Sequence, residues 1–206
     1  MLRRYAIVSV VSLLALLSFF ALGMMSTAQA AILFFDDANP TQPGWTTSGL
    51  VYAGTIGGIT SPTGNPYGVI VASPLGDSYI QRVVSTLNYE NISLQYYRRT
   101  YAAESVDRFI ASWSLDGSSW TNLESVSPTT NWGPVTFNLS GLNSGVNNSS
   151  VYLRFKMDNG NLILGGLDYG LLDNVQVSGD IIPEPATLSL LGLGLLGLLG
   201  FKKKKA

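Results

Sequence analysis

The residue types that carry most enzyme chemistry are missing from this 206-residue chain. It contains no histidine and no cysteine. Serine–histidine–aspartate and cysteine–histidine catalysis therefore lack their base, and histidine- or cysteine-ligated zinc sites lack their ligands. Two kinds of side chain remain: carboxylates, which act as acids, bases or ligands of hard cations, and aromatic rings beside arginines, which bind sugars.

The carboxylates do not define a catalytic site by their spacing. A suitable pair could hydrolyse a glycosidic bond, but nothing in the sequence selects one pair among the thirteen acidic residues. No phosphate-binding loop, nucleophile elbow or metal–histidine spacing occurs either. We therefore predict that the protein is not an enzyme and name no catalytic residue, with a glycoside hydrolase as the alternative.

Aromatic residues and arginines gather in the middle of the chain and suggest a sugar-binding face. Stacking rings and hydrogen-bonding arginines would suit a mostly preformed carbohydrate site. The alternative is that these rings are core or half-buried strand residues. The candidate glycan contacts are Tyr96, Tyr97, Arg98, Tyr101 and Trp132.

The C-terminal segment has three parts in a fixed order. Pro183-Glu184-Pro185 keeps the chain extended, because each proline fixes its own φ and disfavours helix in the residue before it. An uncharged run rich in leucine and glycine then reaches Phe201 and approaches the ~20 apolar residues that span a bilayer. It ends at four basic residues that favour the cytoplasmic side, namely Lys202, Lys203, Lys204 and Lys205. We predict a single transmembrane helix that leaves the rest of the chain outside.

This arrangement resembles the PEP-CTERM sorting signal of exported bacterial proteins. The resemblance covers residues 181–206, although the all-lysine tail departs from the arginines that are commoner there. It implies that an exosortase, a membrane-embedded cysteine protease, processes the protein near Pro183-Glu184-Pro185. It also implies delivery to the cell surface or its polysaccharide layer.

The N-terminus has the features of a secretory signal peptide. Arg3 and Arg4 precede a long apolar run, and small residues at Ala28 and Ala30 suit a signal peptidase that cuts before Ala31. An uncleaved anchor is the alternative, since the run is long for a signal peptide, and twin-arginine export is a further one.

Without these two signals, residues 31–180 form one unit large enough to bury a core. The terminal segments hold six of the twelve basic residues but only one of the thirteen acidic ones, so this central unit has a net charge of −6. Nucleic acid is therefore excluded as a partner, because phosphate binding needs a basic surface. With no cysteine, the unit must be stabilised by its core or by a bound ion.

The central unit is predicted to be an antiparallel β-sandwich. Short apolar or alternating segments follow one another, separated by glycine, proline and Asp-Gly turns, and no helical period appears. The clearest strand alternates from Val151 to Asp158. An up-and-down barrel is the competing architecture.

Several short landmarks resemble jelly-roll domains of the galactose-binding-like and MAM-like kind. They include Phe34 to Trp45, Trp113 to Trp120, and Tyr152 to Phe155. The resemblance implies adjacent first and last strands and a calcium ion near them. Oxygen ligands for it would come from Asp36, Asp37, Asp173 and Asn174. The alternative is that these residues occupy solvated strand ends.

Together these features predict an exported protein with three parts: a signal peptide (1–30), a β-sandwich (31–180) and a sorting signal (181–206). Its expected partners are signal peptidase, an exosortase-like protease and, before processing, the inner membrane. We expect a non-catalytic structural or adhesion role at the cell surface, associated with exopolysaccharide. A carbohydrate-binding module or carbohydrate-active enzyme is the alternative.

Overall fold

The computed structural model describes residues 30–64, 67–72, 78–139, 148–160 and 167–182. This part of the chain is all β, with eleven strands. None of the described residues forms an apolar helix long enough to span a membrane. The expected signal helix and C-terminal transmembrane helix lie outside the described residues.

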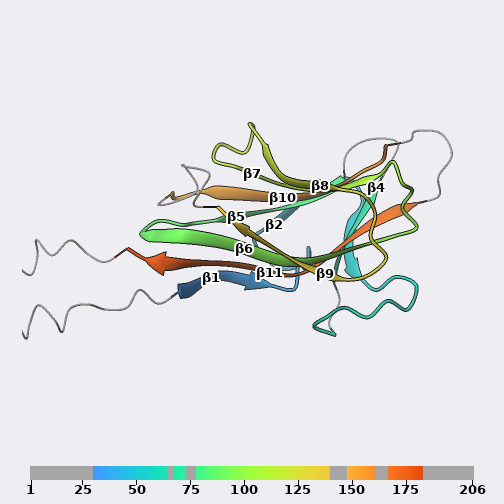
Figure 1. Cartoon of the computed structure of the whole chain (residues 1–206), viewed down its shortest axis with the longest axis horizontal. Helices are drawn as coiled ribbons and strands as arrows, with labels where there is room; N and C mark the ends of the chain where they lie inside the picture. The colour runs from blue at the N-terminus through green and yellow to red at the C-terminus, as the bar shows by residue number, and fades with distance from the viewer. Residues whose placement is uncertain (1–29, 65–66, 73–77, 140–147, 161–166, 183–206) are drawn as a thin grey trace, which may run out of the picture.

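The strands form two antiparallel sheets stacked as a sandwich (Figure 1). Sheet A has six strands in the order β3-β4-β11-β6-β9, with β1 also paired to β11. Its strands are β1 (Ala30–Asp36), β3 (Val51–Gly54), β4 (Tyr67–Ala72), β6 (Tyr89–Tyr101), β9 (Gly133–Asn138) and β11 (Asp168–Ile181). Sheet B has five strands in the order β2-β5-β10-β7-β8. Its strands are β2 (Trp45–Ser48), β5 (Ser78–Val84), β7 (Arg108–Ser114), β8 (Thr121–Val126) and β10 (Val151–Asp158). The prediction of a sandwich is confirmed, and the strands do not close into the alternative barrel.

The long strand β11 organises sheet A. It pairs with β6 along its length, with β4 near its start and with β1 near its end. The first and last strands are therefore neighbours, and β1 begins where β11 ends, at the same end of the sandwich (Figure 1). The register shifts between Asp173 and Gln176, where Asn174 has a φ of +53°. Asparagine is one of the few residues that adopts this conformation readily.

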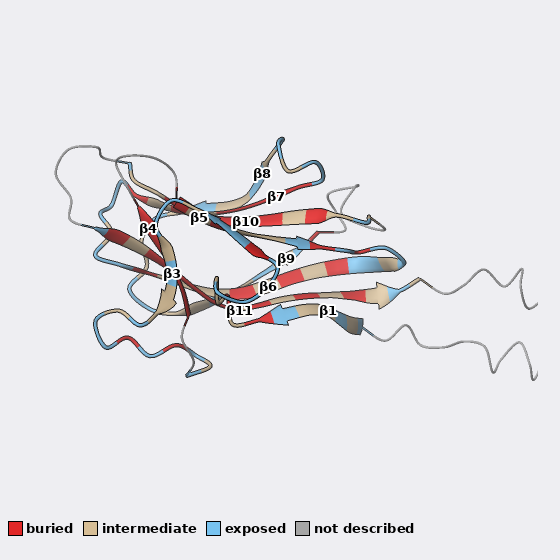
Figure 2. Cartoon of the chain, turned by 180° about the vertical axis from the view of Figure 1, so that it is seen from behind, coloured by how far each residue is buried: buried red, intermediate tan, exposed pale blue. Residues whose placement is uncertain are grey.

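The main core lies between the two sheets (Figure 2). In β10, Val151, Leu153, Phe155 and Met157 are buried, and the residues between them are not. Tyr96, Phe109 and Phe155 form an aromatic cluster with ring centroids 4.9–6.5 Å apart. The period of two in the sequence thus has its expected cause: one face of each strand packs on the opposite sheet.

A second apolar cluster lies on the outer face of sheet A. It consists of Ile59, Tyr67, Val69, Val71 and Leu171. The chain between β3 and β4 covers it, since Tyr67 Oη donates to the Ile59 carbonyl and accepts the Ile56 N–H. Both faces of β4 are therefore buried, and its sequence shows a continuous apolar run instead of alternation.

Candidate functional site

The outer face of sheet B carries a cluster that we call the Arg154 platform, defined by Tyr79, Gln81, Trp120 and Arg154. The Arg154 guanidinium lies between two rings, with Cζ 3.7 Å from the centroid of Trp120 and 4.1 Å from that of Tyr79. Gln81 Oε1 accepts from Arg154 Nε at 3.1 Å and Nη2 at 2.8 Å. A flat cation stacked on two ring faces and held by two hydrogen bonds is a preorganised surface.

Strand register explains why these residues meet. Arg154 is paired with Gln81 on β5 and with Ser112 on β7. Because alternate residues of β10 are buried, Arg154 faces away from the core with its strand neighbours Tyr152 and Lys156. The hairpin between β7 and β8 then brings Trp120 over this face.

The hairpin packs closely on the same face. Gly117 has a φ of +73°, and a Cβ there would come within 3.2 Å of the Tyr152 ring. Glycine is needed both for the backbone conformation and for the approach. Trp120 and Tyr152 therefore flank Arg154 on a face whose other paired residues include Ser112 and Asn122.

The chemistry of this face suits a neutral polyol. Aromatic rings contact the C–H faces of a sugar, and the amide groups of Gln81 and Asn122 can bond its hydroxyls. The residues were not among the predicted glycan contacts. The available signal was the alternation of Tyr152, Arg154 and Lys156 with apolar residues, which marks them as one outward face.

The structure does not bring the predicted glycan contacts together on one face. Tyr96 is fully buried in the main core, which corrects its assignment as a sugar contact. Arg98 is held in an ion pair, with Nε 2.7 Å from Glu124 Oε1. Tyr97 and Tyr101 alternate with these two residues, so they face the outer side of sheet A. Trp132 packs edge-on against Tyr67 and donates to the Thr60 carbonyl.

Residues predicted to bind calcium do become neighbours. Asp36 is paired with Val175, next to Asp173 and Asn174, and the charge of Asp37 raises the pKa of Asp173. Burial is the larger cause of that rise, and hydrogen bonds from Thr63 oppose it. Asn174 Oδ1 is buried with no hydrogen-bond partner in the described part of the chain. However, among the described residues no group of three acidic side chains is arranged to hold a metal ion.

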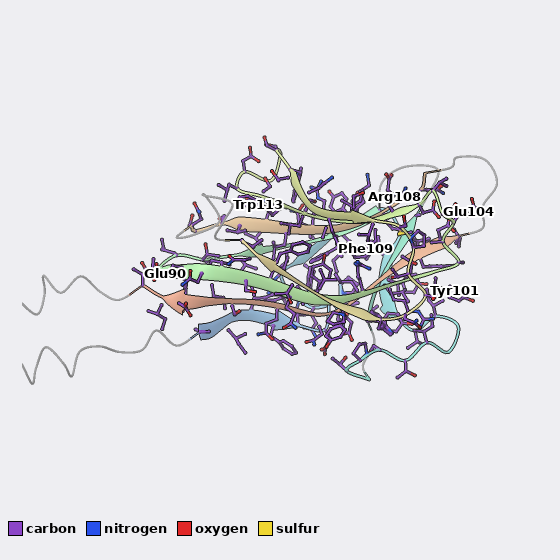
Figure 3. The ribbon with its side chains drawn as sticks, viewed as in Figure 1. Glu90, Tyr101, Glu104, Arg108, Phe109 and Trp113 are labelled. Carbon is purple, nitrogen blue, oxygen red and sulfur yellow. The ribbon has the colours of Figure 1, made fainter. Side chains whose placement is uncertain are left out.

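Two more buried carboxylates lie close to Glu104, which Figure 3 shows at one end of the sandwich. Asp107 is 1% exposed and accepts the backbone N–H groups of Glu104 and Gly160. Asp168 is 2% exposed. Burial, then the negative charges of Asp107 and Glu104, raises the pKa of Asp168 to about 6. The folded protein therefore holds this proton more tightly than the unfolded chain does.

We expect Asp168→Asn to stabilise the protein at neutral pH and not at acidic pH. A carboxyl whose folded pKa is raised costs stability as pH rises from about 4 to about 6, and the full cost remains above that range. The substitution should therefore raise the unfolding free energy by about 1–3 kcal/mol at pH 7. Thermal melts of the full chain at both pH values test this. Asp158→Asn, which removes a charge from an exposed site, is the control, and equal effects of both variants at pH 7 would contradict the interpretation.

The sorting and processing residues are mostly outside the described part of the chain. Pro183, Glu184, Pro185 and Lys202 to Lys205 lie there, as does Ala28 of the predicted signal-cleavage site. Ala30 and Ala31 are the first two residues of β1. The last described residue, Ile182, donates its N–H to the Asn88 carbonyl at 2.9 Å. The described part of the fold therefore ends directly before Pro183.

Residues 182–205 match the PEP-CTERM protein-sorting motif, which confirms the resemblance found in the sequence. The motif implies export, with a membrane-anchored C-terminus before exosortase processing.

The sandwich is similar to carbohydrate-binding and adhesin domains. One is the CBM22-1 xylan-binding domain from Paenibacillus barcinonensis Xyn10C, with 14% identity, a TM-score of 0.52, and coverage of 77% of this chain and 100% of that one. Another is the K1 cleaved adhesin domain of Lys-gingipain from Porphyromonas gingivalis W83, with 14% identity, a TM-score of 0.51, and coverage of 72% and 97%. At this identity the likeness shows the jelly-roll fold alone. No curated protein sequence matches the chain.

Proposed function

We propose that this protein is an exported, non-catalytic carbohydrate-binding component of the cell surface. The observation that carries the proposal is the Arg154 platform, where a guanidinium is fixed between two rings on the outer face of a sheet. Such a surface offers ring faces and fixed donors at little entropic cost on binding. The jelly-roll fold supports this proposal, because it presents a broad sheet face to a chain-like ligand.

The platform is suited to binding and not to hydrolysis. Hydrolysis of a glycosidic bond needs two carboxyl groups on either side of it. The four side chains that define the platform include none, and Arg154 Nε and Nη2 donate to the Gln81 amide. A carbohydrate-active enzyme is the second candidate, supported by the two buried carboxylates Asp107 and Asp168 at one end of the sandwich.

The ligand should be an extracellular polysaccharide with neutral units. The predicted exported unit has a net charge of −6, so an acidic polymer would be repelled over most of its surface. The predicted route is secretion by the signal peptide, temporary anchoring in the inner membrane, and exosortase processing. The protein would then remain in the polysaccharide layer, where binding retains it.

We expect Trp120→Ala to weaken glycan binding by about tenfold or more, because it removes one ring from the platform. A glycan array followed by titration of the best ligand measures this, using the full chain in a detergent without a sugar headgroup. Tyr101→Ala is the matched control, since it removes an exposed ring from the opposite sheet. If Tyr101→Ala lowers the affinity for the glycan and Trp120→Ala does not, the glycan-binding site lies on sheet A.

A hydrolysis screen on the same ligands tests the enzyme alternative. Turnover that disappears on replacing one carboxylate, with Asp107→Asn and Asp168→Asn as first variants, would overturn the non-catalytic proposal.

Calcium remains a proposal for the corner formed by Asp36, Asp37, Asp173 and Asn174. The carboxylate oxygens of the three aspartates and the unpartnered Asn174 Oδ1 support it. An ion that binds only the folded state raises its stability. We therefore expect a chelator to lower the melting temperature and added Ca²⁺ to restore it, with Mg²⁺ as the control. An unchanged melting temperature would count against the site.

A further inference from the structure

Both ends of the described chain lie at one end of the sandwich. Ala30, the first residue of β1, is paired with Asp180 near the end of β11. Figure 3 shows Glu90 at this end and Glu104 at the opposite end. The predicted signal peptide and the predicted transmembrane helix would therefore join the fold at the same end, and either of them would hold it near the inner membrane. We call it the anchor end and define it by residues 85–91 and 178–182.

The turn between β5 and β6 completes the anchor end. Its Asn88 carbonyl accepts the Ile182 N–H at 2.9 Å, and the next residue, Tyr89, is paired with Ile181. Ile182 is therefore held by the sandwich, and the connection to the membrane begins only after it.

This connection is short. Only Pro183-Glu184-Pro185 separates Ile182 from the uncharged run that begins at Ala186. A chain spans at most ~3.6 Å per residue, so Ala186 lies within about 14 Å of Ile182. The polar headgroup layer on each side of a bilayer is about 5–7 Å thick. If Ala186 begins the membrane span, Ile182 lies no more than about 9 Å outside the headgroups.

The apolar run is also short for a membrane span. The 16 residues from Ala186 to Phe201 would form a helix about 24 Å long, whereas the hydrocarbon core is about 30 Å thick. Such a mismatch is accommodated by thinning of the bilayer, by oligomerisation or by the residues that flank the span. If the flanking residues move towards the hydrocarbon, Ile182 moves with them. The mismatch therefore favours contact between the anchor end and the headgroups.

The anchor end presents apolar side chains beside this connection. Leu87 in the β5–β6 turn is 49% exposed, and Ile181 is 51% exposed. The hydrogen bond between Asn88 and Ile182 brings the two side chains to the same corner of the sandwich. Single exposed apolar residues are ordinary on protein surfaces, but these two lie directly next to the membrane anchor.

The charged residues of the anchor end decide which lipid surface it fits. Glu90 is exposed, and Asp180 accepts from Asn91 Nδ2 at 2.9 Å. Residues 85–91 and 178–182 contain no arginine or lysine. An anionic headgroup layer would therefore repel the anchor end, whereas a zwitterionic layer would not.

We propose that, before processing, the anchor end rests on the bilayer surface with Leu87 and Ile181 in a layer of zwitterionic headgroups. Two half-exposed side chains are too few to bind a free domain stably, but the anchor makes the contact intramolecular, so a weak interaction is sufficient. The contact would hold the Pro-Glu-Pro segment within reach of a membrane-embedded protease. The strands run lengthwise away from this end (Figure 1), so the outer faces of both sheets would remain free.

The absence of cysteine allows the contact to be measured with single spin labels. Ser85→Cys places a nitroxide in the exposed β5–β6 turn, and Ser105→Cys places one in an exposed turn at the opposite end. The labelled full chain is reconstituted in phosphatidylcholine vesicles, and the collision rate of each label with oxygen is divided by its rate with a neutral nickel chelate. Oxygen concentrates in lipid and the chelate in water, so we expect this ratio to be about threefold or more higher for the Ser85 label.

Two matched double variants test the apolar side chains. Leu87→Ser with Ile181→Ser should lower the ratio of the label in the β5–β6 turn, because serine gains nothing by leaving water. Val106→Ser with Leu167→Ser should leave the ratio unchanged, since these residues are similarly exposed, at 46% and 51%, but lie at the opposite end. Leu87→Ser alone provides a second variant if the first double variant does not fold.

The lipid class is tested by replacing part of the phosphatidylcholine with phosphatidylglycerol. Glu90 and Asp180 would then face anionic headgroups, so the ratio should fall at low salt and recover at high salt. A rise in the ratio would contradict the assignment of a zwitterionic surface.

Vesicle flotation reports anchoring separately, so the outcomes are distinct. The inference rests on the membrane anchor that the sorting motif implies, and not on glycan binding. Equal ratios at Ser85 and Ser105 in a chain that floats would overturn the docking and leave the sorting signal intact. A high Ser85 ratio that persists in the Leu87→Ser, Ile181→Ser variant would also overturn it, because the short connection alone would then explain the proximity. A full chain that does not float would refute the anchor and this inference together.

Discussion

Replacing Pro183-Glu184-Pro185 by three alanines is expected to leave full-length protein in the inner membrane. The motif lies within the segment that matches the PEP-CTERM protein-sorting motif. Proline disfavours a helix and alanine favours one, so we expect the substitutions to let a helix form in place of the predicted extended segment. A protease that grips an extended segment would then lose its substrate. Immunoblots of inner-membrane and extracellular fractions measure the change.

The position of the motif makes this test specific. Ile182, whose N–H is donated to the Asn88 carbonyl, is the last residue that the structure describes. The three substitutions therefore lie outside the described fold and should leave its melting temperature unchanged. Pro128→Ala, a proline substitution in the connection between β8 and β9, is the control and should be processed normally. Normal release of the three-alanine protein would refute the assignment of the motif as the processing signal.

Sequence periodicity predicted the sandwich because most strands bury only one face. β10 follows the alternation residue by residue, and its buried positions form the centre of the core. The alternation of buried and outward-facing residues fails in two places. β4 is buried on both faces, because the segment before it folds over sheet A, and the short strands β2 and β3 lie in a region dense in glycine and proline. In both places tertiary contacts decide the structure.

The candidate sugar-binding face was harder to predict, since composition does not reveal which face a residue occupies. Tyr96 and Tyr97 are adjacent in sequence, yet Tyr96 is in the core and Tyr97 faces outward. Arg98 likewise points inward to Glu124. The platform, by contrast, joins residues from β5, β10 and the β7–β8 hairpin, which only the sheet order brings together. The platform could be found only from the observed pairing of these strands.

We expect Glu124→Ala to cause a large loss of stability. Glu124 on sheet B accepts from two residues of sheet A, from Tyr96 Oη at 2.5 Å and from Arg98 Nε at 2.7 Å. The side chains of Arg98 and Glu124 are 16% and 8% exposed. Burial, then the charge of Glu124, raises the pKa of Tyr96, so the phenol remains a donor. Alanine would leave the buried Tyr96 hydroxyl without its acceptor, and it would leave the buried Arg98 cation with a long hydrogen bond from Nη1 to Thr129 Oγ1 at 3.4 Å.

Breaking such a pair costs about 3 kcal/mol, which for a fold of this size lowers the melting temperature by about 6–12 °C. Glu124→Gln keeps an oxygen acceptor and should lose less stability than Glu124→Ala. Asp158→Ala breaks the more exposed pair with Lys156 and should change the unfolding free energy by no more than about 0.5 kcal/mol. Thermal melts of the full chain compare the three variants.

The double variant Arg98→Met with Glu124→Leu tests the cause of the loss. Replacing both partners of a buried pair by apolar residues removes the unpaired charge and is often neutral or stabilising. The double variant should therefore recover much of the stability lost in Glu124→Ala, although the Tyr96 hydroxyl still lacks its acceptor. If Glu124→Ala and Asp158→Ala destabilise equally, water must reach Arg98 freely. The ion pair between the sheets would then contribute little, and apolar packing in the main core, including Tyr96 against Phe109 and Phe155, would join the two layers.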